Sequence, residues 1–158
     1  MIFATMGTQI PFDRFLRMLD QVAPLLKGEQ IIAQTIPGHY KPTNFETVGL
    51  IGPELFTRYI ESARIIVSHA GMGTIINALT ARKPIVVVPR MASLGEHRNE
   101  HQLATARRLG EMGFVHVAND ATQLLDALTT DSLQKLRTIA DTAPASMVRA
   151  ISGALDKN

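Results

Sequence analysis

The chain has 158 residues, a length that suits one domain with a buried core. Apolar residues make up 46% and charged residues 19%, a balance typical of globular proteins rather than of disordered chains. The 16 basic side chains are offset by 14 acidic ones, form no basic run, and are accompanied by few aromatic residues for base stacking. Nucleic-acid binding is therefore not indicated. The chain has no cysteine, which excludes disulfides and thiolate metal ligands.

The sequence contains no apolar stretch of the length that a membrane span requires. A strand is predicted from the first residues onward, which leaves no room for a signal peptide. We therefore expect a cytoplasmic protein, whose association with a membrane has to come through a partner.

Predicted strands and helices alternate along the chain. Short apolar segments predict strands at residues 2–5, 30–36, 45–51, 64–68, 84–88 and 114–117. Apolar side chains at helical spacing predict helices at residues 12–22, after Pro53, and at 74–81 and 100–112, with two or three more at the end of the chain. Strands that are apolar on both faces are typical of a parallel sheet covered by helices on both sides. We therefore predict a doubly wound α/β sheet, with residues 1–158 forming one domain.

In such sheets ligands bind beyond the carboxyl ends of the strands. This rule selects four loops, at residues 6–11, 51–53, 69–73 and 89–98.

A glycine-containing turn joins the strand at 64–68 to the next helix. Gly71 and Gly73 allow a tight turn and a close approach of the backbone to a ligand. The N–H groups at the start of the helix would favour a diphosphate, and Thr74 could either cap the helix or donate to a phosphate oxygen. A P-loop is excluded because its lysine is absent, and the dinucleotide fingerprint fails because Ile76 replaces its third glycine. The alternative that this motif is only a tight turn and binds no ligand remains open.

A second polar loop follows the strand at 84–88. Seven hydrogen-bonding side chains follow Gly95 without interruption, at residues 96–102. Sugars need such dense arrays to discriminate between hydroxyl positions, although a solvated helix start is the simpler alternative. His97, Glu100 and His101 also match the H-x-x-E-H zinc-protease signature. That signature needs both histidines in one helix and a third ligand, for which the sequence offers no motif.

The sequence resembles the C-terminal, donor-binding domain of family-28 glycosyltransferases of the GT-B fold. The resemblance is carried by residues 5–8 with Phe12 and Asp13, and by residues 67–74, 83–90 and 99–102. It is closer to free-standing forms of the domain, such as the catalytic subunit of the two-chain transferase that adds the second GlcNAc to dolichol diphosphate. Residues 90–102 look most like the branch from bacterial exopolysaccharide pathways.

The resemblance implies a Rossmann-like domain that binds a UDP-sugar donor. Residues 71–74 would hold the diphosphate, and residues 7 and 8 would face the phosphates or the cleft between domains. Residues 50 and 51 would line the uracil pocket through backbone groups, and residues 100–102 would contact ribose or sugar hydroxyls. Asn77 stands where many relatives place a glutamate, which weakens the expected ribose contact. The residues assigned to the donor are Gly7, Thr8, Leu50, Ile51, Gly71, Met72, Gly73, Thr74, Asn77, Glu100, His101 and Gln102.

The implied reaction is an inverting transfer from the UDP-sugar to a lipid-linked acceptor in polysaccharide biosynthesis. No metal and no tightly bound cofactor is expected, in keeping with the absence of a carboxylate pair after any predicted strand. His69 and His97 are the candidates for the general base, unless the partner supplies it. The transferred sugar stays open between glucuronic acid, glucose and GlcNAc.

The expected partner is a membrane-associated, acceptor-binding subunit, which would hold the chain at the inner face of the membrane. Val148, Ile151 and Leu155 share one face of a predicted helix at 145–155, which would dock on this partner or fold back on the chain's own core. Two other functions remain open. One is a non-catalytic UDP-sugar-binding or regulatory module, and the other is a zinc hydrolase built on His97 and His101.

Overall fold

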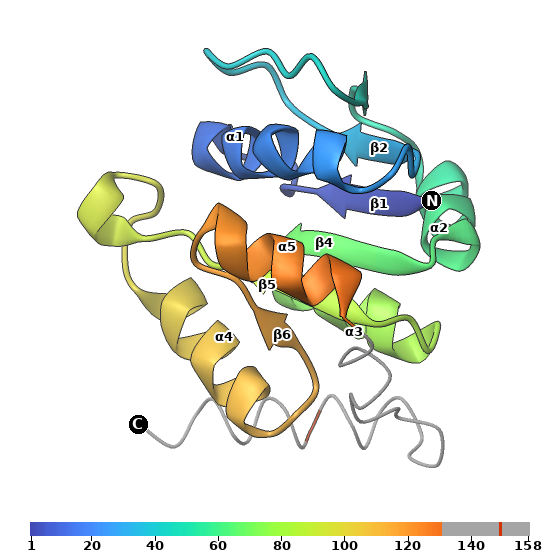
Figure 1. Ribbon diagram of the computed structural model, residues 1–158. Coiled ribbons are helices and arrows are strands. Elements are labelled where there is room, and N and C mark those ends of the chain that lie inside the picture. The colour runs from blue at the N-terminus through green and yellow to red at the C-terminus, as the bar shows by residue number, and fades with distance from the viewer. Residues whose placement is uncertain (131–148, 150–158) are drawn as a thin grey trace.

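The computed structural model describes residues 1–130 and residue 149 of the chain. Within them, strands and helices alternate as predicted, except that no helix separates the second strand from the third (Figure 1). The strands are β1 (Ile2–Thr5), β2 (Ile31–Gln34), β3 (Glu46–Val48), β4 (Ile65–His69), β5 (Ile85–Val88) and β6 (His116–Val117). The helices are α1 (Asp13–Val22), α2 (Pro53–Ser62), α3 (Met72–Thr80), α4 (His101–Glu111) and α5 (Ala121–Thr129), with short 3-10 turns η1 (Ala23–Leu25) and η2 (Ala92–Leu94).

The strands form one parallel sheet in the order β3-β2-β1-β4-β5-β6. From β1 the chain first builds outward through β2 and β3, and then returns to the other side of β1 to build β4, β5 and β6. This reversal makes the sheet doubly wound, as predicted, and opens a crevice between the carboxyl ends of β1 and β4. The arrowheads of β1, β2 and β4 point to the left in Figure 1.

Both faces of the sheet are covered, which explains why its strands are apolar on both sides. Ile2 and Ala4 of β1 belong to a core cluster with residues of α1 and α5. Phe3 points to the opposite face, into a second cluster built with α2, α3 and α4. There its ring stacks on Tyr59 at 5.2 Å and meets Phe56 edge-on at 5.6 Å. Helices on both faces hold the carboxyl edge of the sheet in a fixed shape, and that edge carries the site.

The third strand is shorter than the predicted 45–51. As an edge strand β3 pairs only with β2, and their register ends where Gln34 meets Val48. Leu50 and Ile51 therefore lie in the loop before α2 and do not end a strand, and the Leu50 side chain is 64% exposed.

Two helix starts also differ from the prediction. Helix α3 begins at Met72 with Gly71 as its N-cap residue, so Thr74 lies within the first turn and does not cap the helix. Helix α4 begins at His101, because the residues before it are held in a loop. The predicted docking helix at 145–155 lies outside the described residues except for residue 149.

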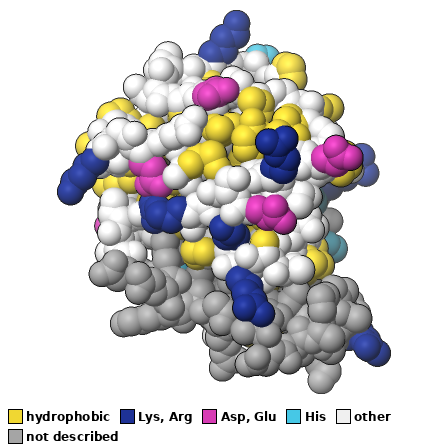
Figure 2. Space-filling model, turned by 90° about the vertical axis from the view of Figure 1, so that its right-hand side faces the viewer, with side chains coloured by type: hydrophobic (Ala, Val, Ile, Leu, Met, Phe, Trp, Pro, Cys, Tyr) yellow, Lys and Arg dark blue, Asp and Glu magenta, His cyan; other side chains and the backbone are white. Residues whose placement is uncertain are grey.

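No helix in the described part of the chain is long and apolar enough to cross a membrane. Figure 2, which shows the right-hand side of Figure 1, has basic and acidic side chains interspersed around a hydrophobic area. The described part of this face carries no continuous basic surface, in keeping with the balanced charge of the sequence.

Candidate functional site

A cavity of about 670 Å³ lies at the carboxyl edge of the sheet. It takes residues from each of the four loops that the strand-end rule selects. Thr5 and Gln34, at the ends of β1 and β2, and His69, at the end of β4, supply its walls from the sheet. The other residues that line it are Met6, Gly7, Thr8, Gln9, Ile10, Ile51, Pro53, Phe56, Gly71, Gly73, Thr74, Asn77, Arg90, His97 and Gln102.

Most of the residues that the sequence assigns to a donor site are brought together here, and four are not. Leu50 and Met72 belong to the right loops but do not line the cavity. Glu100 and His101 are exposed at the start of α4, where the Glu100 carboxylate accepts a hydrogen bond from the Ser93 N–H at 3.0 Å. Of the three residues at this helix start, only Gln102 lines the cavity.

The N-terminus of α3 reaches the cavity through Gly73 and Thr74. The first hydrogen bond of the helix runs from the Ile75 N–H to the Gly71 carbonyl at 3.2 Å. The N–H groups of Met72, Gly73 and Thr74 therefore have no partner within the helix, and they add to the positive end of its dipole. A Cβ atom on Gly73 would meet nothing within 4 Å, so the backbone is open to a ligand at that point.

The other two glycines make room for a side chain of the protein itself. A Cβ on Gly71 would lie 2.2 Å from Nε2 of His69, and one on Gly7 would lie 3.0 Å from the same ring. Gly7 also has a φ of +84°, a conformation that favours glycine. The sequence alone suggests that Gly71 makes room for a ligand, whereas the structure shows that it makes room for His69.

The partly buried position of His69 determines its protonation state. Desolvation lowers the pKa of His69 to about 4, and the nearby charges of Arg90 and His97 act in the same direction. A hydrogen bond with the Thr5 backbone opposes this shift only in part. The imidazole is therefore neutral at physiological pH. It is also a poor candidate for the general base, because an efficient general base has a pKa near the working pH. His97, half-buried on the cavity wall, is held by Asn99, whose side-chain oxygen lies 3.1 Å from Nδ1.

Arg90 is a buried cation beneath the β1–α1 loop. Its side chain is 3% exposed, and its guanidinium donates to the carbonyls of Met6 at 2.9 Å and Pro11 at 2.9 Å, and to that of Ile10. The guanidinium also lies 4.4 Å from the centre of the Phe12 ring. Burial lowers the pKa of Arg90, yet an arginine stays charged at neutral pH. Arg90 thus fixes both ends of the loop that forms one wall of the cavity.

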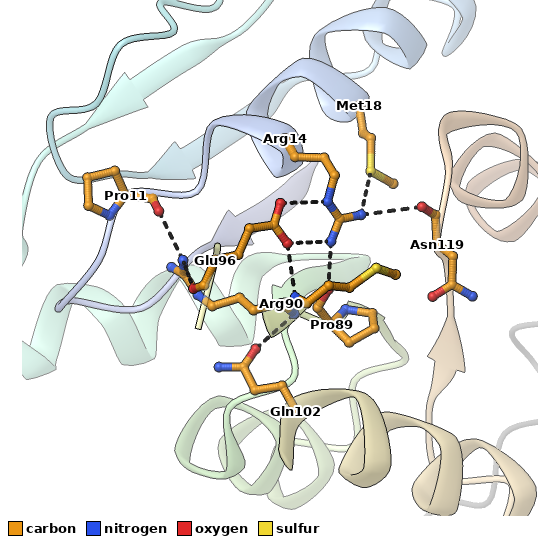
Figure 3. A network of polar contacts seen from close by, with 9 residues as sticks. Pro11, Arg14, Met18, Pro89, Arg90, Glu96, Gln102 and Asn119 are labelled. Atoms are coloured by element: carbon orange, nitrogen blue, oxygen red, sulfur yellow. Dashed lines mark hydrogen bonds and ion pairs between the residues drawn. The ribbon is translucent and has the colours of Figure 1, made fainter. Parts of the chain in front are cut away.

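A second arginine anchors the polar loop before α4 (Figure 3). Glu96 accepts two hydrogen bonds from Arg14, at 2.7 and 2.9 Å, and one from the Met91 N–H at 3.0 Å. Arg14 also donates to the carbonyls of Pro89 at 2.7 Å and Asn119 at 3.3 Å. Arg14 therefore ties α1 to the loop before α4 and to the residues that follow β5 and β6.

These contacts give most of the polar loop a structural role. The predicted sugar-binding series included Glu96, which is engaged by Arg14, and Asn99, whose side-chain oxygen accepts from the His101 N–H at 3.1 Å. Gln102 accepts from the Arg90 N–H at 3.2 Å and leaves its amide nitrogen for the cavity that it lines. Only His97 and Gln102 of this series line the cavity.

The zinc-site alternative does not fit this geometry. His97 lies in the loop, four residues before helix α4 begins at His101, so the two histidines do not share one helix. No group of three histidine, cysteine or acidic side chains in the part of the chain that the structure describes could hold a metal ion.

Sequence reasoning did not assign a site role to Arg90, Gln34 or Phe56. Arg90 directly follows a buried strand, and Gln34 is a polar residue in an otherwise apolar one. Both signals are visible in the sequence. Their partners lie 84 and 29 residues away, however, and only the fold brings them together.

The fold and site together define a Rossmann-like domain with the N-terminus of a helix at its crevice, a position that favours an anionic ligand. The sequence profile of the "Glycosyltransferase family 28 C-terminal domain" matches residues 1–155. The chain belongs to this family, as the sequence motifs suggest.

The curated relatives are similar over about half of the chain. One is the UDP-N-acetylglucosamine transferase subunit ALG13 of Eremothecium gossypii, 34% identical over 76 residues, which are 48% of this chain and 36% of that protein. Its Candida albicans counterpart is 28% identical over 75 residues, which are 48% of this chain and 24% of that protein. The matches thus span about a third or less of these relatives' own lengths.

Solved structures share the fold at low sequence identity. The solution structure of ALG13 superposes with a TM-score of 0.66 and 17% identity over 95% of this chain and 94% of that one. The Streptomyces sp. SF2575 glycosyltransferase SsfS6, complexed with thymidine diphosphate, gives 0.62 and 23% over 96% of this chain and 40% of that one. Arabidopsis thaliana UGT89C1, complexed with UDP-L-rhamnose, gives 0.56 and 13% over 98% of this chain and 38% of that one. In these two enzymes the matching fold is a part of a longer chain.

Proposed function

We propose that the chain is the donor-binding subunit of a two-component glycosyltransferase, and that its cavity binds a UDP-sugar. The observation that carries the proposal is the open N-terminus of α3, which reaches the cavity at Gly73 and Thr74 and whose first three N–H groups have no helical partners. Family membership supports the proposal, because relatives of the same fold were solved with nucleoside diphosphates or nucleotide sugars.

In the proposed reaction the diphosphate is the leaving group. As the bond between sugar and phosphate breaks, negative charge grows on the diphosphate, and the N–H groups of residues 72–74 with the helix dipole would stabilise it. Because these donors are fixed by the fold before the ligand binds, they need little reorganisation during the reaction. No metal is required for this step, and inversion at the sugar is the expected stereochemical outcome.

A partner would supply the acceptor side. We propose a membrane-associated subunit that binds a lipid-linked acceptor and holds this chain at the cytoplasmic face of the membrane. The curated relatives are subunits of a UDP-N-acetylglucosamine transferase, which supports both a partner and GlcNAc as the transferred group. They favour a GlcNAc transferase subunit over a subunit from an exopolysaccharide pathway. The exopolysaccharide pathway stays a prediction from residues 90–102. The weak basicity of His69 leaves His97 or a partner residue as the general base.

The test is thermal stabilisation of the protein by UDP, UDP-GlcNAc, UDP-glucose and UDP-glucuronic acid, with and without EDTA. We expect stabilisation by UDP that does not change with EDTA. Gly73→Ala should reduce it by placing a methyl group in front of the α3 N-terminus, whereas Thr80→Ala, at the exposed far end of the same helix, should not. The proposal would be overturned if none of these ligands stabilised the protein. UDP binding without transfer in the presence of the partner would instead indicate the non-catalytic module.

A further inference from the structure

Gln34 is a buried polar residue at the wall of the cavity for which the proposed reaction gives no role. It ends strand β2, its side chain is 3% exposed, and it lines the cavity. In the sheet register it lies directly beside Thr5, which ends β1 and is 1% exposed. Two polar side chains thus stand together at the end of strands that are otherwise apolar.

The hydrogen bonds around Thr5 fix the orientation of the Gln34 amide. The Gly7 N–H approaches Oγ of Thr5 at 3.5 Å, so the hydroxyl oxygen is on the accepting side of that contact. The hydroxyl proton is then free for Oε1 of Gln34, which lies 2.7 Å away. With its oxygen engaged, Gln34 presents only the two N–H donors of Nε2 to its surroundings.

The amide nitrogen of Gln34 has no hydrogen-bond partner among the described residues, yet it is not sealed inside the protein. The side-chain atom of the described residues that is buried without a partner is Oδ1 of Asp13. Nε2 of Gln34 therefore reaches open space, and the cavity is the space that Gln34 lines. Nε2 is therefore a donor held in a fixed orientation at the cavity wall and available to a ligand.

The position of Gln34 selects the part of the ligand that it would meet. Its neighbouring strand β3 leads into the loop that brings Ile51 and Pro53 to the cavity, and Phe56 of α2 lines the same space. Gln34 and Phe56 lie on the same face of the sheet, since Ala33 points to the opposite core cluster. A flat base suits this apolar wall, whereas the diphosphate suits the N–H groups of α3.

We propose that Gln34 is a base-selecting residue: its amide N–H donates to a carbonyl oxygen of uracil, while Thr5 holds its oxygen away from the ligand. The inference rests on the proposed function and names the part of the nucleotide that gives specificity. A donor fits the carbonyl at the 4-position of uracil but opposes the amino group that cytosine carries there. Sites that present a fixed hydrogen-bonding group reject a ligand of the wrong polarity because groups are left unpaired.

The experiment compares the affinities of UDP, CDP and pyrophosphate by calorimetry for the wild type and for Gln34→Met. Methionine keeps the volume and removes the donors. We expect UDP to bind roughly tenfold more weakly to the variant, CDP to change little, and pyrophosphate to be unaffected. Gln30→Met is the matched control, because Gln30 is exposed at the opposite end of the strand and does not line the cavity.

Thr5→Val is a second and independent variant, which keeps the shape of the side chain and removes the hydroxyl. The freed amide can then turn its oxygen toward the ligand, so the preference for UDP over CDP should fall in this variant too. An unchanged ratio of UDP to CDP affinity in the folded variants would overturn the inference, and so would an equal loss for pyrophosphate, which would place Gln34 at the phosphates. Failure of the wild type to bind UDP would instead refute the proposed function.

Discussion

The ion pair between Arg14 and Glu96 should be a principal tie between α1 and the loop before α4, and Glu96→Gln tests this. The Glu96 carboxylate faces three N–H donors, two from Arg14 and one from Met91. A glutamine would turn an amide N–H₂ toward at least one of them and would leave the Arg14 charge without its partner. The two side chains are only 22% and 14% exposed, so solvent screens the pair less than it screens a surface pair.

Charge-assisted hydrogen bonds of this kind contribute about 1.5–3 kcal/mol, and partial exposure lowers the figure, so we expect a loss of about 2 kcal/mol. The measurement is the free energy of unfolding from urea titration. Glu111→Gln is the matched control, because its partner Arg107 and Glu111 are 82% and 67% exposed and should contribute only about 0.3 kcal/mol. Equal losses in the two variants would refute the reasoning, and combining Glu96→Gln with Arg14→Gln would show whether the losses are coupled.

Two further predictions concern the glycine turn. Gly71→Ala should lower the free energy of unfolding by about 1–3 kcal/mol, since the new Cβ collides with the His69 ring. Gly73→Ala should leave the free energy of unfolding unchanged or raise it, because nothing occupies the space of the new Cβ. Comparable urea midpoints for the two variants would contradict this expectation. The pKa of His69 is about 4 in the folded protein against 6.5 in the unfolded chain, so the unfolded chain binds a proton more readily. The free energy of unfolding should therefore be highest above pH 6.5 and should fall by about 2 kcal/mol by pH 5. His69→Gln should flatten this part of the stability profile, and parallel profiles for the variant and the wild type would argue against a neutral imidazole with a lowered pKa in the fold.

The fold could be predicted from the sequence because its signals are local. Apolar segments on the scale of a strand, alternating with helical periodicity, are sufficient to define a parallel sheet with two covered faces. The strand-end rule then selects the loops that form the cavity. The predicted boundaries of β3 were wrong. An edge strand ends where its single neighbour ends, and the sequence of β3 itself does not show that β2 ends at Gln34.

The roles of individual polar residues could not be predicted, because they depend on partners far away in the sequence. Glu96 looks like a ligand-binding residue until Arg14, 82 positions earlier, is seen to hold it. Gly71 looks like a glycine kept free for a phosphate until the ring of His69 is seen to fill its space. Polar density in a loop therefore indicates that the loop is held by hydrogen bonds, and only the fold tells whether protein or ligand provides the partners.

The hydrogen bonds from Arg90 to the β1–α1 loop restrict the length of that loop. One guanidinium holds the carbonyls of Met6 at the start of the loop and of Ile10 and Pro11 at its end. The distance that the intervening residues 7–9 must span is therefore set by the size of a single planar group. An inserted or deleted residue would release at least one carbonyl from a buried cation, so this loop cannot vary in length as surface loops usually do. Chains that retain an arginine at this position should retain the loop length, and a change in one should be accompanied by a change in the other.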